Sequence, residues 1–181
     1  MARPSTAARR YAEAAFEIAV RDGTVDAWRA DLDAAATVLA GPAVAGAVEN
    51  PAIAPAVRER AVRAGLESSI GPAPLNLILF MLRRGRIDQL PRVVEEFRRL
   101  DDQRRGIVHA TATSASPLET SEVVALTARL EQLTGGTIEL TVETDPSLLG
   151  GLVVRVGDRL IDGSVRGRLE RLRNQLVSGA L

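Results

Sequence analysis

The chain has 181 residues, of which 46% are hydrophobic, 25% are charged and 3% are aromatic, and its 23 basic residues balance 23 acidic ones. All the basic residues are arginine, cysteine is absent and histidine occurs once. This composition excludes a thiolate nucleophile, a disulfide framework, cysteine-ligated zinc, a lysine Schiff base and a phosphate loop built on lysine.

Up to about Arg105, the apolar residues of the chain recur with the period of an α-helix. The first predicted helix carries two apolar faces, one with Tyr11, Ala15 and Ile18 and a neighbouring one with Ala12, Phe16 and Ala19. Thr24 is positioned to cap a second helix that runs to Leu39 and is ended by Gly41-Pro42.

Four further helices are predicted before the pattern changes. Short ones span residues 43–49 and 56–66, and Gly71-Pro72 opens a strongly apolar helix through Leu75–Leu82. The last carries Leu90, Val93, Val94, Phe97 and Leu100, with Asp88 as its expected cap and Pro91 in its first turn. The longest apolar run is too short for the ~20 residues of a membrane span, and Glu13 and Glu17 interrupt any secretory signal.

Beyond Gly106 the pattern predicts strands over residues 107–113, 137–143, 152–156 and 159–162. One helix is expected over residues 119–133, ended by Gly135-Gly136, and another from Ser164. The last helix is expected to bury Val165, Leu169, Leu172 and Leu176. The predicted fold class is therefore α+β, mainly α, with a six-helix bundle in residues 1–105 and a small α+β domain in residues 106–181.

Features that could carry chemistry have simpler structural readings. His109 lies in a predicted strand without an acid and nucleophile at motif spacing, which favours a structural role. Ser164 opens a helix close to arginines and could hold a phosphate, but no phosphate-loop or dinucleotide glycine pattern accompanies it. The arginine clusters at Arg83–Arg86 and in the last helix lack interleaved aromatics, which disfavours nucleic acid. No catalytic residue, metal site or cofactor is predicted.

The doubled apolar faces of the first helix and of the helix through Leu75–Leu82 are more informative. One apolar stripe is enough to pack a helix on its own core. The extra face indicates either complete burial in the bundle or a groove that accepts a partner's amphipathic helix, and the pattern alone leaves both open.

Three motifs in order connect these observations to a known family. They are RRYAEAAFEIA (Arg9–Ala19), RRGRIDQLPRVVEEF (Arg83–Phe97) and DPSLLGGLVVRVGDRLIDGSVRGRLERL (Asp145–Leu172). Together they resemble the delta subunit of F-type ATP synthase, the oligomycin-sensitivity-conferring protein family, over essentially the whole chain. The most specific positions are Gly150, Gly151, Gly157, Asp158, Asp162, Gly163 and Ser164.

The resemblance implies a non-catalytic stator subunit, present once per complex, on the cytoplasmic face of the bacterial cell membrane without inserting into it. Its N-terminal bundle would bind the N-terminal segments of the alpha subunits on the catalytic head, and its C-terminal domain would bind subunit b of the peripheral stalk. The family's groove lies between the first and fifth helices. This makes six residues candidate contacts: Tyr11, Ala15, Ile18, Ile78, Leu79 and Leu82.

Two other functions remain as alternatives at this stage. The first is a nucleic-acid-binding adaptor that uses the arginine clusters. The second is a nucleotide-binding or hydrolytic enzyme that uses Ser164 and the arginines near it.

Overall fold

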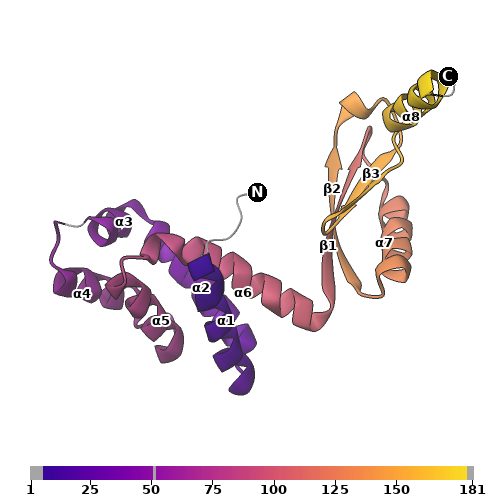
Figure 1. Cartoon of the computed structure of the whole chain (residues 1–181). Helices are drawn as coiled ribbons and strands as arrows, with labels where there is room; N and C mark the ends of the chain where they lie inside the picture. Colours follow the sequence, from indigo (N-terminus) through magenta and orange to yellow (C-terminus); the bar gives the residue numbers. More distant parts are fainter. Residues whose placement is uncertain (1–5, 51, 179–181) are drawn as a thin grey trace. The chain divides into compact units, whose positions relative to one another are not determined.

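The computed structural model describes residues 6–50 and 52–178, and the chain divides into two compact units, residues 1–101 and 102–181 (Figure 1). The first unit is made of helices, and the second combines a four-stranded sheet with two helices. This confirms the predicted α+β, mainly α fold class.

Six α-helices build the first unit. They are α1 (Thr6–Arg21), α2 (Val25–Ala40), α3 (Pro42–Glu49), α4 (Pro55–Leu66), α5 (Pro72–Arg83) and α6 (Leu90–Arg105), with a short 3-10 helix η1 (Ile87–Gln89) before the last. Helix α6 continues for four residues past the end of this unit. Proline in the first turn of α3, α4 and α5 is tolerated because the amide it lacks would have no partner there.

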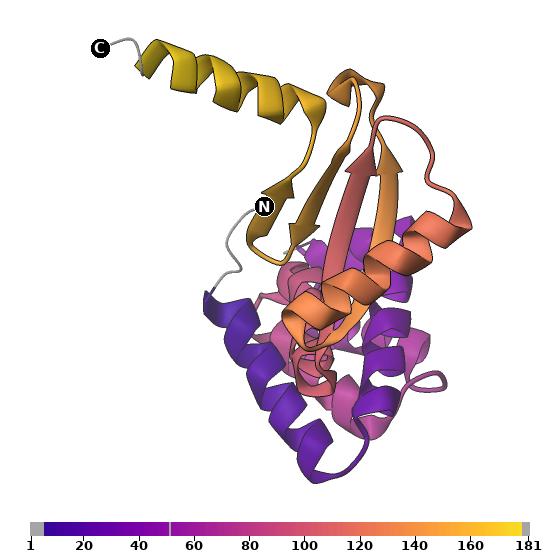
Figure 2. The ribbon, with the colours of Figure 1, turned by 90° about the vertical axis from the view of Figure 1, so that its right-hand side faces the viewer.

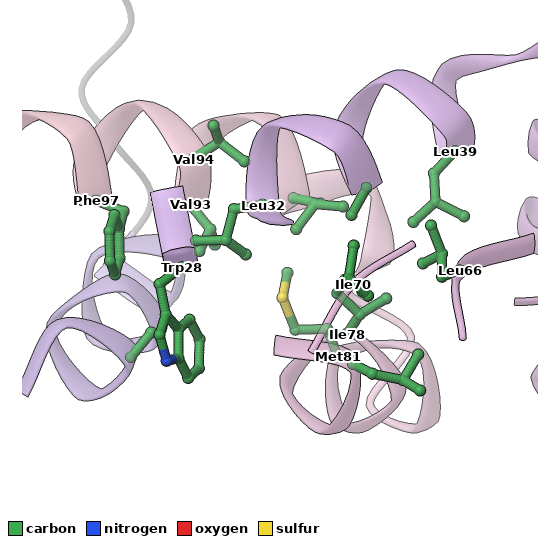
Figure 3. Close-up of a cluster of buried hydrophobic side chains, with 14 of the residues drawn as sticks. Trp28, Leu32, Leu39, Leu66, Ile70, Ile78, Met81, Val93, Val94 and Phe97 are labelled. Carbon is green, nitrogen blue, oxygen red and sulfur yellow. The ribbon is translucent and has the colours of Figure 1, made fainter. Parts of the chain in front are cut away.

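The core of the first unit lies where α2, α5 and α6 meet (Figure 3). The ring of Phe97 stacks on Trp28 with 6.2 Å between ring centroids and meets Phe16 edge-on at 5.4 Å. The face that α1 buries is made of alanine: Ala8, Ala12, Ala15 and Ala19. Because alanine is small, α1 can approach its neighbours closely, and the larger apolar side chains of α1 remain at its flanks.

Two expected helix caps were wrong in detail. Thr24 stands at the N-cap position of α2, but its side chain makes no capping hydrogen bond. Asp88 lies inside η1, which runs directly into α6 at Leu90, so no free helix start remains at Asp88 for its carboxylate to cap. Asp31 of α2 instead accepts a hydrogen bond of 2.9 Å from the amide of Gly71, the N-cap residue of α5.

The second unit contains β1 (Ile107–Ser114), α7 (Thr120–Thr134), β2 (Thr137–Thr144), η2 (Pro146–Leu148), β3 (Leu152–Val156), β4 (Arg159–Asp162) and α8 (Val165–Ser178). The strand order is β2-β1-β3-β4, with β1 and β2 parallel and the other neighbours antiparallel. Helix α7 makes the crossover between the parallel strands and packs Leu130 on one face of the sheet, against Ala110, Ala112, Ile138 and Val154. Gly135 ends α7 in the left-handed conformation (φ 71°), as predicted.

The prediction that α8 buries its apolar face was wrong. The residues concerned are 44–67% exposed: Val165, Leu169, Leu172 and Leu176. Figure 2 shows the reason, because α8 extends away from the end of the sheet instead of lying along it. Within the described residues, no element of this unit covers that face.

Candidate functional site

An aromatic pair on the surface of the first unit joins α1 to α5. The rings of Tyr11 and Phe80 meet edge-on, with centroids 6.1 Å apart and an interplanar angle of 81°. The guanidinium carbon of Arg84 lies 5.2 Å from the centroid of Phe80, which is cation–π geometry. Phe80 is nevertheless 45% exposed, so this large ring remains available to a partner.

An open cavity of about 410 Å³ lies beside this pair. Its lining comes from the start of α1 and from the end of α5 with the turn that follows: Thr6, Ala7, Arg10, Tyr11, Phe80, Arg84 and Arg86. The lining therefore combines two aromatic rings with three arginine side chains, a composition that suits recognition of a peptide better than bond-making chemistry.

The six candidate contact residues fall into two groups. Ala15, Ile78, Leu79 and Leu82 are at most 6% exposed and belong to the bundle's own core. Tyr11 is half-buried beside the cavity, and Ile18 is 37% exposed further along α1. Only these two offer side-chain surface to a partner.

Phe80 and Arg10, which the structure brings to this surface, were not predicted as contact residues, and Arg84 was noted only as part of the cluster Arg83–Arg86. Phe80 and Arg84 are four residues apart, the spacing that places two side chains on the same face of a helix. That spacing was visible in the sequence. The position of Arg10 depends on how α1 packs on α5, which the sequence pattern does not contain.

The glycine-rich motif of the second unit builds a close backbone crossing. Gly151 has φ 83°, and a Cβ atom at this position would lie 2.6 Å from the carbonyl oxygen of Gly163. The amide of Val165 donates a 2.9 Å hydrogen bond to the carbonyl of Gly150. Gly157 (φ 55°) and Asp158 form the tight turn between β3 and β4. These residues hold the start of β3 against the connection from β4 to α8.

Asp162 and Ser164 organise the first turn of α8. Asp162 Oδ1 accepts hydrogen bonds from the amide of Ser164 (2.8 Å) and from its hydroxyl (2.7 Å). The Ser164 hydroxyl oxygen accepts from the amide of Gly167 at 3.0 Å. These bonds from Ser164 hold the pKa of Asp162 below its ordinary value. Ser164 is only 2% exposed and is fully engaged as a helix cap, which leaves it unsuited to act as a nucleophile or to hold a phosphate.

The apolar face of α8 is the second candidate surface. Its residues repeat at steps of four, three and four, which is the spacing of a helix-to-helix seam: Val165, Leu169, Leu172 and Leu176. Exposed apolar side chains of the adjoining hairpin and turn are Leu149, Leu160 and Ile161. Leu149 is 76% exposed and has φ 59°, an uncommon conformation for a residue other than glycine.

The described residues give little support for a metal site, a membrane-spanning helix or a catalytic histidine. Residues 6–50 and 52–178 contain no group of three acidic or histidine side chains arranged to hold a metal ion. The same part of the chain has no helix long and apolar enough to cross a membrane. Nε2 of His109 donates a hydrogen bond of 2.7 Å to the Asp102 carboxylate near the end of α6, which fits a structural role.

Comparison with known proteins identifies what kind of protein carries these two surfaces. The family described as "ATP synthase delta (OSCP) subunit" matches residues 7–176. This chain belongs to the ATP synthase delta (OSCP) family. Members of this family are non-catalytic structural components of ATP synthase. This excludes the alternative of a nucleotide-binding or hydrolytic enzyme that uses Ser164.

Individual relatives agree with this family assignment. The "ATP synthase subunit delta" of Citrifermentans bemidjiense is 35% identical over 174 residues, which are 95% of this chain and 97% of the relative. That of Anaeromyxobacter sp. strain Fw109-5 is 40% identical over 171 residues, with 93% and 96% covered. A chain in the cryo-EM structure of the Toxoplasma gondii mitochondrial ATP synthase hexamer has a TM-score of 0.68 at 21% identity, covering 96% of this chain and 98% of that one. That likeness supports the fold.

Proposed function

We propose that this protein is the stator subunit that links the alpha/beta catalytic head of an F-type ATP synthase to the peripheral stalk. Held in this way, the head does not turn with the rotor, and torque drives ATP synthesis. The proposal rests on the presence of one exposed apolar surface on each unit of a delta-family chain. On the first unit this is the cavity beside Tyr11 and Phe80, called the α1/α5 groove, and on the second it is the exposed apolar face of α8, called the α8 face.

The α1/α5 groove, meaning the cavity beside Tyr11 and Phe80, is the proposed site for the N-terminal segments of the alpha subunits. A partner helix laid against these rings buries apolar surface at about 25 cal/mol per Å², and a few hundred Å² gives several kcal/mol before association costs. Aromatic anchors of this kind carry much of the energy in peptide interfaces.

The α8 face is the proposed site for subunit b. A seam of apolar residues at heptad spacing suits packing against another helix, and its exposure leaves it free to do so within the described residues. The complex as a whole would place the protein peripherally on the cytoplasmic face of the bacterial cell membrane, one copy to each complex.

Titration calorimetry of the full chain with a synthetic peptide copying the alpha N-terminus tests the first site. We expect binding, with Phe80→Ala weakening it by about tenfold or more. Val57 on α4 is 46% exposed, close to the 45% of Phe80, so Val57→Ala is the matched control. Absence of binding by a correctly folded chain would contradict the groove proposal.

A pull-down with the soluble part of subunit b tests the second site. Leu172→Asp places a charge in the middle of the α8 face and should abolish the interaction, because burying an unpaired carboxylate is costly. Val124→Asp on α7 is the control, since Val124 is also exposed (64%) but lies outside the α8 face. Equal loss in both variants would refute this assignment.

A further inference from the structure

Three arginines from two segments of the chain line the cavity of the α1/α5 groove. Arg10 comes from α1, Arg84 follows the end of α5, and Arg86 lies in the turn before η1. Among the seven described residues that line the cavity, none is acidic. The cavity therefore concentrates positive charge in a chain whose net charge is zero.

Among the described residues, these arginines have no ion-pair partner, whereas their sequence neighbours do. Arg9 pairs with Glu13 at 2.8 Å, and Arg83 pairs with Glu59 at 2.8 Å. In the part of the chain that the structure describes, no carboxylate lies within ion-pair distance of Arg10, Arg84 or Arg86. Residues 1–5, which precede α1, contain no acid either. Within the described residues, no ion pair therefore neutralises the charge of the cavity.

The geometry favours a carboxylate next to an apolar group. With Arg84 over the ring of Phe80, the N–H groups of its guanidinium can donate to one carboxylate through two parallel bonds. Tyr11 and Phe80 line the same cavity, so an apolar side chain of the same ligand can contact these rings. An amphipathic peptide with acidic residues beside an apolar anchor satisfies both.

We propose that the α1/α5 groove selects an acidic segment of its partner polypeptide, with aspartate or glutamate side chains that neutralise Arg10, Arg84 and Arg86 around an apolar anchor on Phe80. This inference rests on the proposed function, which places a partner in this groove, and adds the charge that the partner must carry. A polyanion such as RNA would meet the same charges, but the cavity offers only one exposed aromatic ring for base stacking.

The expected effect follows from the exposure of these groups. An ion pair at a surface of this kind contributes about a two- to fivefold change in affinity. Removing all three charges should therefore weaken binding by about tenfold or more at low salt. Most of the loss should appear in the association rate, because exposed charges act mainly by steering the encounter.

The test measures binding of a fluorescent alpha N-terminal peptide to the full chain by polarisation, at about 50 mM and about 500 mM sodium chloride, where screening differs strongly. The variant is R10Q/R84Q/R86Q. The control R9Q/R83Q/R98Q removes equal charge from arginines that pair with acids within the chain. A second peptide with every Asp and Glu changed to Asn or Gln tests the same charges without altering the protein.

We expect the cavity variant to bind about tenfold or more weakly at low salt, the control to change less than about twofold, and high salt to remove the difference. The amide peptide should bind wild type weakly and lose nothing further in the cavity variant. The charge inference is overturned if neither the R10Q/R84Q/R86Q substitutions nor the amide peptide weakens binding. It is also overturned if the native alpha segment contains no acidic residue. Either result leaves the proposed function intact.

Failure of the native peptide to bind wild type at any salt overturns the proposed function and this inference with it. Single-stranded RNA is the last ligand tested, as a competitor of the peptide. If RNA displaces the peptide, and its own binding is lost in R10Q/R84Q/R86Q, the site takes polyanions in general and selection for an acidic peptide is refuted.

Discussion

Replacing Gly151 with valine should destabilise the second unit and leave the stability of the first unchanged. Gly151 has φ 83°, and its added Cβ would lie 2.6 Å from the carbonyl oxygen of Gly163 and 2.9 Å from Cα of Ser164. Both contacts are with backbone, which cannot move aside as the end of a flexible side chain can. The connection from β4 to α8 must therefore shift.

The size of the effect has two parts. Holding a residue other than glycine in the left-handed region costs about 1–2 kcal/mol. Forcing extra atoms into a closely packed site adds about 1–3 kcal/mol. The total of roughly 2–5 kcal/mol is a large fraction of the stability of a small domain.

Urea unfolding followed by two probes separates the units. Trp28 is the only tryptophan and lies in the core of the first unit, stacked on Phe97, so its fluorescence reports that unit. Far-ultraviolet circular dichroism reports both units. We expect the fluorescence midpoint to stay unchanged, while a second, earlier transition appears in circular dichroism.

Gly157→Val supplies the control. Gly157 also has positive φ (55°), but a Cβ there would meet nothing within 4 Å. Both variants bear the cost of a positive φ, but only Gly151→Val also bears the steric clash. Gly151→Val should therefore be more destabilising than Gly157→Val by about 1–3 kcal/mol. Equal destabilisation of the two variants, or an equal shift of the Trp28 transition, would refute the reasoning.

Three further outcomes are expected. Phe97→Ala removes a 1% exposed ring and should cost about 3–5 kcal/mol, read from the urea midpoint of tryptophan fluorescence. Asp31→Ala leaves the amide of Gly71 without its acceptor and should cost about 1–2 kcal/mol by the same assay; no change would show that water replaces the carboxylate. Ser164 lowers the pKa of Asp162, so the stabilisation is present above the ordinary value of 3.8 and disappears as pH falls through the lower, folded-state pKa. Asp162→Asn should therefore flatten the acid dependence of the second unit's unfolding midpoint below about pH 4.

The order and type of the elements could be read from the sequence because local patterns decide them. β-branched content located β1, alternation located β2, a continuous apolar run located β3, and the turn at Gly157-Asp158 located β4. The bounds of β3 and β4 are those that were predicted. Gly135 was predicted to end a helix because a left-handed residue is needed there, and the structure confirms it.

Contacts between elements could not be read in the same way. Nearly every position of α5 from Leu75 to Leu82 is apolar, so periodicity cannot tell that Phe80 faces outward while Ile78 and Leu79 face the core. The apolar stripe of α8 was correctly located, but such a pattern predicts only that the stripe is covered, not which element or chain covers it. For Leu169 and Leu172 that cover is absent from the described part of the second unit, and the proposed cover is another chain.

Helix α6 carries two neighbouring carboxylates that belong to different units. It runs unbroken from Leu90 to Arg105 across the boundary between the units, which falls between Asp101 and Asp102. Asp101 is fully buried and pairs with Arg29 at 3.2 Å in the first unit, whereas Asp102 bonds to His109 in the second.

Each of these neighbouring carboxylates therefore bonds within its own unit. A segment of glycine and serine would lengthen under tension by losing entropy alone. Lengthening the helix from Leu90 to Arg105 would instead require breaking its backbone hydrogen bonds. This stretch of the chain therefore resists extension along its own axis.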